Sequence, residues 1–60
     1  MIPSNIIIIP TYNEELNIGI LLEILKSDFS DFFILVIDDS PNELTKKTFD
    51  NHKNNNCTII

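Results

Sequence analysis

The chain alternates between short apolar runs and segments with helical spacing, and polar residues mark each change. Residues 5–10 carry four consecutive isoleucines and end in proline. A continuous β-branched run of this kind is typical of a strand buried on both faces in a parallel sheet. Similar runs at residues 32–37 and 57–60 predict two further strands.

The segments between these strands have the spacing of amphipathic helices. From Glu14 to about Ser27 one apolar face is predicted, formed by Ile18, Leu21, Leu22 and Leu25. Three further residues widen this face, so we expect more than one neighbour to cover the helix: Leu16, Ile20 and Ile24. A second helix is predicted to open at Pro41 or Asn42, with Lys46 and Lys47 in its last turn, where cations are favourable. Residues 51–56 are predicted to form a loop.

The order strand, helix, strand, helix, strand predicts an α/β fold with a parallel sheet and right-handed crossovers. The carboxyl ends of parallel strands meet at one edge, which is where ligands bind in such sheets. Two polar segments therefore share this edge, at residues 11–14 and at residues 38–41.

The first polar segment, Thr11-Tyr12-Asn13-Glu14, has two interpretations. Thr11 and Glu14 have the spacing of a capping box, in which a hydroxyl and a carboxylate bind free amides of a new helix. Alternatively, the ring of Tyr12 stacks on a base while Asn13 and Glu14 bind ribose hydroxyls. We favour the ligand role, because an exposed tyrosine here has no structural need.

The second polar segment begins with Asp38 and Asp39. Adjacent carboxylates repel each other, so such a pair usually needs hydrogen-bond donors or a hard cation such as Mg²⁺. The alternative is that one aspartate caps the following helix and the other is solvated. Among other polar residues, His52 is interpreted as a solvated helix end and Cys57 as a small buried hydrophobe.

Composition excludes several classes of protein. Sixty residues make one small domain, and a hydrophobic fraction of 43% indicates a packed core. A net charge of −5 with only four basic residues disfavours nucleic acid and anionic lipid as partners. No apolar run approaches the roughly 18 residues that span a membrane. The N-terminus lacks the pattern of a signal peptide, and the single cysteine cannot form an internal disulfide, so a cytoplasmic chain is expected.

Both polar segments resemble a known family. Ile-Ile-Pro-Thr-Tyr-Asn-Glu at residues 8–14, followed by Val-Ile-Asp-Asp-Ser-Pro at residues 36–41, is similar to the start of inverting glycosyltransferases of the GT-A fold, family 2 type. The dolichol-phosphate mannosyltransferase-like branch is the most similar. The resemblance covers nearly the whole chain and implies the N-terminal, Rossmann-like nucleotide-binding part of that fold.

The resemblance also implies a reaction and a set of contacts. A hexose would pass from a GDP- or UDP-sugar to an acceptor such as a polyprenyl (dolichyl) phosphate. The residues that it implies for binding the donor nucleotide are Pro10, Thr11, Tyr12, Glu14, Asp38 and Asp39. Asp38 is expected to contact the base, and Asp39 to support the same pocket. Where the family often has Asp-Asp-Gly-Ser, this chain has Ser40 and Pro41, so the glycine is missing or the loop is one residue shorter.

In family members the metal-binding Asp-x-Asp element and the catalytic base lie beyond the position of Ile60. We therefore expect residues 1–60 to form part of a nucleotide-sugar-binding domain that is incomplete at its C-terminus. The full-length enzyme is expected to use Mg²⁺ or Mn²⁺, held by residues outside this chain, and to act in the cytoplasm at a membrane face. The 60-residue chain alone is expected to be inactive.

Two other hypotheses remain at this point. Residues 34–41 also resemble the first strand of response-regulator receiver domains, in which an acidic pair binds magnesium. Receivers open with that strand, however, whereas here a complete strand and helix precede it. A small α/β interaction module that pairs through an open sheet edge would instead self-associate without binding nucleotide.

Overall fold

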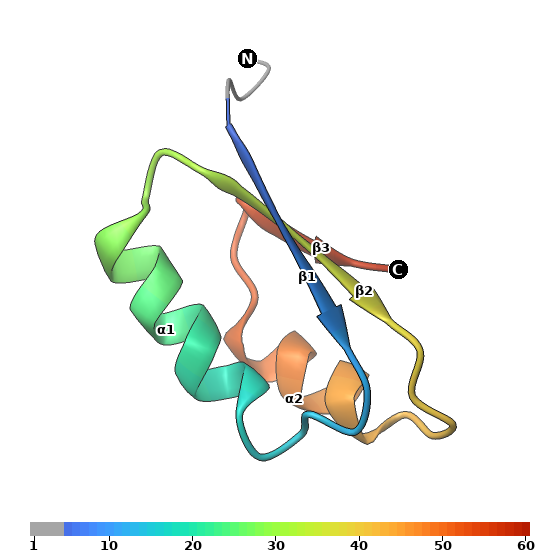
Figure 1. The fold of residues 1–60 in the computed structure, drawn as a ribbon. Coiled ribbons are helices and arrows are strands. Elements are labelled where there is room, and N and C mark those ends of the chain that lie inside the picture. Colours follow the sequence, from blue (N-terminus) through green and yellow to red (C-terminus); the bar gives the residue numbers. More distant parts are fainter. Residues whose placement is uncertain (1–4) are drawn as a thin grey trace.

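The structure is a computed structural model, and it describes residues 5–60. Its elements follow the order β1 (Ile6–Thr11), α1 (Ile18–Asp28), β2 (Phe33–Asp38), α2 (Leu44–His52) and β3 (Cys57–Ile59). The strands are parallel, with β2 between β1 and β3, so the predicted β-α-β-α-β arrangement is confirmed (Figure 1). The expectation about a signal peptide falls partly on residues 1–4, which lie outside the described range.

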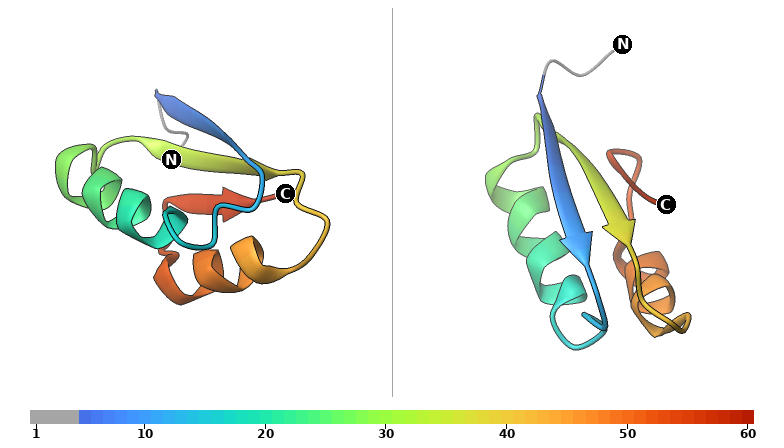
Figure 2. Two further views of the ribbon diagram at one scale, coloured as in Figure 1. Left: turned by 60° about the horizontal axis from the view of Figure 1, so that its bottom comes forward. Right: turned by 45° about the vertical axis from the view of Figure 1, so that its right-hand side comes forward.

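Both helices cover the same face of the sheet (Figure 2). Two crossovers of the same hand between neighbouring strands place their helices on one side, and α1 contacts α2 there. The buried core between the sheet and the helices consists of Ile18, Leu22, Leu25, Ile34, Val36, Phe49 and Cys57. The prediction for Cys57 is therefore confirmed.

The opposite face of the sheet is open in the part of the chain that the structure describes. Along β1 the exposure alternates, because Ile7 and Ile9 pack on the core while Ile6 and Ile8 are 56% and 60% exposed. The prediction that this strand is buried on both faces is therefore wrong. A run of isoleucines identifies a strand, but it does not determine how many layers cover it.

The first helix begins four residues later than predicted, at Ile18 instead of Glu14. Residues 15–17 form a turn, in which the carbonyl of Glu14 accepts hydrogen bonds from the amides of Asn17 and Ile18 at 3.0 and 2.8 Å. Three apolar residues of this region face solvent, namely Leu16, Ile20 and Ile24. The expected second neighbour of this helix is thus not found within residues 5–60.

The second helix begins at Leu44, so Lys46 and Lys47 lie in its first turn and the prediction that they end it is wrong. Residues 41–43 form a bend, and the side chain of Asn42 accepts a hydrogen bond of 3.0 Å from the amide of Leu44. The helix then continues through residues 51 and 52, which were predicted to be loop. Of the described helices, none is long and apolar enough to cross a membrane.

A polar cluster joins the two helices at the far end of α2. His52 is the last residue of that helix, which agrees with its interpretation as a helix end although residues 51–56 were also predicted to form a loop. It is not solvated as expected: its ring is half-buried, and its Nδ1 lies 2.9 Å from Glu23 Oε2. Lys26 Nζ lies 3.0 Å from the same oxygen and donates a hydrogen bond of 2.9 Å to the carbonyl of His52. These contacts, that of His52 first, lower the pKa of the Glu23 carboxyl. Gly19 makes the close helix contact possible, because a Cβ there would lie 2.7 Å from the His52 ring.

Candidate functional site

The ends of β1 and β2 meet in register, with Thr11 opposite Asp38. The Thr11 hydroxyl donates a hydrogen bond of 2.8 Å to Asp38 Oδ1 and is almost fully buried. It therefore does not cap a helix: the N-cap of α1 is Asn17, which makes no side-chain capping bond. The capping-box interpretation is wrong because Thr11 belongs to the strand and its side chain faces the neighbouring strand end.

Asp38 is held by two hydroxyl groups on the same oxygen. Besides Thr11, the Ser40 hydroxyl donates to Oδ1 at 2.6 Å, a length typical of a bond to an ionised carboxylate. The Ser40 hydroxyl chiefly, and Thr11 with it, lower the pKa of Asp38 against a partial opposing effect of burial. Near neutral pH the side chain is therefore an anion that only accepts hydrogen bonds. The sequence pattern indicated that this acidic pair needs hydrogen-bond donors or a cation. For Asp38, two hydroxyl groups are the donors.

Asp39 has a different environment from its neighbour. Its side chain is exposed, and its backbone amide donates a hydrogen bond of 3.0 Å to the carbonyl of Thr11, which extends the pairing of the two strands. Neither aspartate caps α2, whose N-cap Glu43 makes no side-chain capping bond. The capping alternative for the acidic pair is therefore wrong, and only Asp38 takes part in the side-chain contacts at the strand ends.

The two polar segments, residues 11–14 and 38–41, form the first and the second polar loop at the strand ends. The first loop lies against the second, and against the start of α2, through its backbone. The amide of Asn13 donates a hydrogen bond of 2.8 Å to the Ser40 hydroxyl, and the amide of Glu14 donates one of 3.0 Å to the Thr45 hydroxyl. Tyr12 is 56% exposed, so its ring is accessible for stacking on a flat ligand. Pro10 is exposed and Glu14 half-buried at the same edge.

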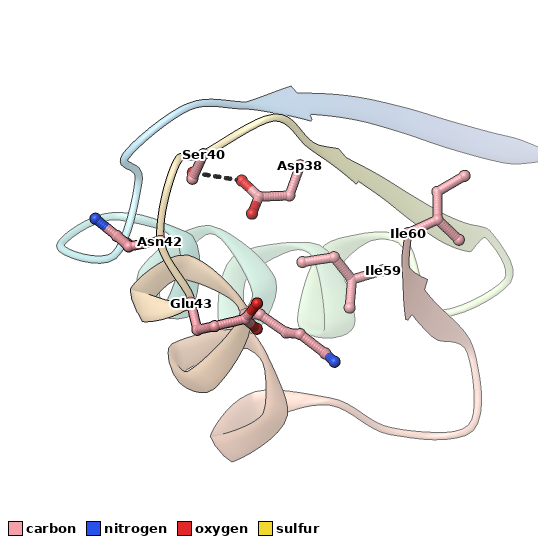
Figure 3. A pocket seen from close by; sticks show the side chains of 7 residues that line it. Asp38, Ser40, Asn42, Glu43, Ile59 and Ile60 are labelled. Atoms are coloured by element: carbon pink, nitrogen blue, oxygen red, sulfur yellow. Dashed lines mark hydrogen bonds between the residues drawn. The ribbon is translucent and has the colours of Figure 1, made fainter.

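A cavity of about 250 Å³ opens beside Asp38, between the ends of β2 and β3 and the start of α2. Its lining consists of Asp38, Ser40, Asn42, Glu43, Lys46, Ile59 and Ile60 (Figure 3). In the close view the carboxylate of Asp38 bonds to Ser40 through one oxygen and turns the other toward the cavity. The volume is below the roughly 300–1,000 Å³ of sites for whole ligands, so it suits a part of one, such as a base.

Of the residues expected to bind the nucleotide, only Asp38 lines this cavity. Pro10 and Thr11 instead end β1, and Tyr12, Glu14 and Asp39 lie on the loops that follow the strands. The sequence interpretation missed the contributions of the segment that follows the acidic pair, above all Asn42, Glu43 and Lys46. Their position directly after a strand end was the available signal, because the connections at this edge line ligand sites in parallel sheets.

The acidic pair does not form a metal centre by itself. Within residues 5–60, no group of three or more histidine, cysteine, aspartate or glutamate side chains is placed to hold a metal ion. At Asp38, hydroxyl donors occupy one carboxylate oxygen. A cation at this edge would therefore need ligands in addition to the side chains of the pair.

The sequence model of glycosyl transferase family 2 matches residues 6–60, which include both polar loops and all five elements. The comparisons with curated proteins and with solved structures gave no significant match. The family match favours the glycosyltransferase resemblance over the receiver, and it implies a nucleotide-sugar donor and an acceptor. Three parallel strands with two helices are consistent with the N-terminal Rossmann-like part of a GT-A fold. The chain belongs to glycosyl transferase family 2.

Proposed function

We propose that the edge formed by the ends of β1 and β2 binds the nucleotide of the sugar donor, with Asp38 reading the base. The observation that carries this proposal is the carboxylate of Asp38, which two hydroxyls hold in place beside a cavity of base size. The exposed ring of Tyr12 is then available to stack on the base. Such stacking is worth about 1–3 kcal/mol in proteins that bind nucleic-acid bases.

The chemistry of Asp38 indicates which bases are favoured. A carboxylate that only accepts hydrogen bonds pairs with a ring N–H, which uracil and guanine present on their pairing edge. Cytosine and adenine present an unprotonated ring nitrogen there, beside an amino group that can also donate to a carboxylate, so the ring N–H is the feature that favours uracil and guanine. We therefore propose a UDP- or GDP-sugar as the donor.

The charges around the site suggest how the diphosphate is accommodated. Glu14, Asp39 and Glu43 add negative charge near Asp38, and among the described residues that line the cavity Lys46 is the one cation. A diphosphate at this edge needs further positive charge, and we propose that a divalent cation, Mg²⁺ or Mn²⁺, accompanies the donor. The transfer of a hexose to a polyprenyl phosphate, as in dolichol-phosphate mannosyltransferase-like enzymes at a cytoplasmic membrane face, is proposed on the resemblance of the two loops alone.

A titration followed by ¹H–¹⁵N NMR tests the proposal. UDP, GDP, CDP and ADP are added in turn to the labelled chain with Mg²⁺ present. We expect UDP or GDP to shift the signals of residues 10–14 and 38–46, while CDP and ADP shift them much less. Asp38→Asn removes the charged acceptor and should abolish this preference. Ser27→Ala, at an exposed position near the end of α1, is the control and should leave the preference unchanged. Signals that stay unchanged with all four nucleotides in a folded chain would refute the proposal.

A further inference from the structure

We propose that Ser40 and Thr45 are positioning residues for the donor nucleotide, an inference that rests on the proposed function above. Their hydroxyls lie between the first loop and Asp38. Ser40 Oγ accepts from the amide of Asn13 at 2.8 Å and lies 3.2 Å from Thr45 Oγ1. Thr45 Oγ1 accepts from the amide of Glu14 at 3.0 Å. Neither hydroxyl needs to touch the ligand for this role.

The directions of these hydrogen bonds follow from counting protons. The hydroxyl proton of Ser40 goes to the ionised Asp38, which can only accept. In the contact between the two hydroxyls, Thr45 is therefore the donor and Ser40 the acceptor. The result is a chain from the Glu14 amide through Thr45 and Ser40 to the carboxylate, in which every bond points the same way. Bonds aligned in this manner polarise one another.

The first loop has a backbone conformation that needs such support. Asn13 has a φ of 54°, in the left-handed region that non-glycine residues seldom adopt, although asparagine tolerates it better than most. Its amide and the next one are the groups that Ser40 and Thr45 bind. Because Tyr12 directly precedes Asn13, the two hydroxyls also hold the backbone that carries the tyrosine ring.

Burial adds to the coupling between the loops. Thr45 is fully buried although it is polar. If the first loop moved away, the buried Thr45 oxygen would no longer accept from the Glu14 amide and would keep only its bond to Ser40, so the interior would lose one hydrogen bond. Glycine at position 40 would remove the hydroxyl that both loops share.

The test measures nucleotide affinity and loop order in the same variants. Ser40→Ala, Ser40→Gly and Thr45→Val each remove one hydroxyl, whereas Thr45→Ser retains it and serves as the rescue. Ser27→Ala, on the exposed face near the end of α1, is the control for loss of a hydroxyl. UDP and GDP are titrated by calorimetry, amide exchange is followed at Asn13 and Glu14, and urea unfolding shows whether each variant is folded.

We expect the three deletions to weaken binding about fivefold and to accelerate amide exchange at Asn13 or Glu14 by a similar factor, which corresponds to one hydrogen bond. Thr45→Ser and Ser27→Ala should bind like the parent chain. Should Thr45→Val fail to fold, the two Ser40 variants carry the test. Binding by the parent chain with equal affinity in the Ser40 variants overturns the positioning role and leaves the proposed function standing. No binding by the parent chain refutes the proposed function and the positioning role together.

Discussion

Replacing Asp38 by asparagine tests whether the charge of this side chain stabilises the junction of the two strands. Asparagine has nearly the same shape and keeps one carbonyl oxygen for the hydroxyls of Thr11 and Ser40, which now lie 2.8 and 2.6 Å from Oδ1. The substitution therefore removes the charge and retains an acceptor. What it changes is the strength of two hydrogen bonds.

The size of the effect follows from these two bonds. A hydrogen bond to a charged group contributes about 1.5–3 kcal/mol and a neutral one about 0.5–1.5, so each bond should weaken by about 1 kcal/mol. Asp38 is partly exposed, and solvent screening reduces the sum of the two. We expect Asp38→Asn to lower the free energy of unfolding by about 1 kcal/mol. A chain of this length has roughly 3–9 kcal/mol in total, so the variant should still fold.

The pH dependence distinguishes a loss of charge at Asp38 from a loss of packing, which would not vary with pH. The pKa of Asp38 is lower in the folded chain than in the unfolded one, so its contribution is present above the unfolded value, near pH 4. That contribution is lost as the pH falls through the lowered pKa of the folded state. The difference in stability between Asp38→Asn and the parent chain should therefore be largest near pH 7 and fade below about pH 4.

Urea unfolding followed by circular dichroism, repeated between pH 7 and pH 3, measures this difference. Asp39→Asn is the control, because its carboxylate is adjacent but exposed and should change stability by no more than about 0.5 kcal/mol. Equal losses in the two variants would contradict the argument. So would a loss in Asp38→Asn that keeps its full size at the lowest pH.

Three further predictions concern the rest of the fold. Gly19→Ala should stabilise α1 by about 1 kcal/mol in a His52→Ala background but not in the parent chain, because there the new Cβ meets the His52 ring. A double-mutant cycle by urea unfolding measures this coupling, and equal effects in both backgrounds would exclude the contact. Because the pKa of Glu23 is lowered, Glu23→Gln should reduce stability above its unfolded pKa and lose this effect as the pH falls through the folded value, which thermal melts at several pH values would show. Ile34→Ala should lower the free energy of unfolding by about 2–5 kcal/mol, whereas Ile8→Ala on the open face should lower it by about 1 kcal/mol or less. Similar losses in denaturant unfolding would mean that the open face is covered in solution.

The order of the elements was predictable from the sequence, because period and residue type identify strands and helices locally. Runs of isoleucine and valine, interrupted by leucines at helical spacing, were enough for the parallel β-α-β-α-β arrangement. The edge that carries the polar loops followed from the parallel order, since it brings the carboxyl ends of all strands to one side. Thr11 and Asp38 are indeed opposite each other.

The parts that could not be predicted depend on tertiary contacts. Whether a second layer covers β1 is not encoded in the run of isoleucines itself, and Ile8 is exposed. The first residue of each helix depends on the turn before it. In these turns, hydrogen bonds join Glu14 to Asn17 and Asn42 to Leu44. The contacts of Thr45 join groups 31 residues apart in the chain, and no local pattern indicates such a pair.

The alternation of side chains along the strands determines which aspartate belongs to the site. The residues of β1 and β2 that face the helices are paired in register, as Ile7 with Ile34, Ile9 with Val36 and Thr11 with Asp38. The hydrogen bond between Thr11 and Asp38 is therefore the next layer after two apolar layers of the core. The same alternation turns Asp39 away from Asp38, because successive side chains point to opposite faces. A deletion of one residue within β2 would move Asp39 into the position of Asp38 and turn Asp38 to the opposite face, so the packing of the core determines which of two adjacent aspartates faces the cavity.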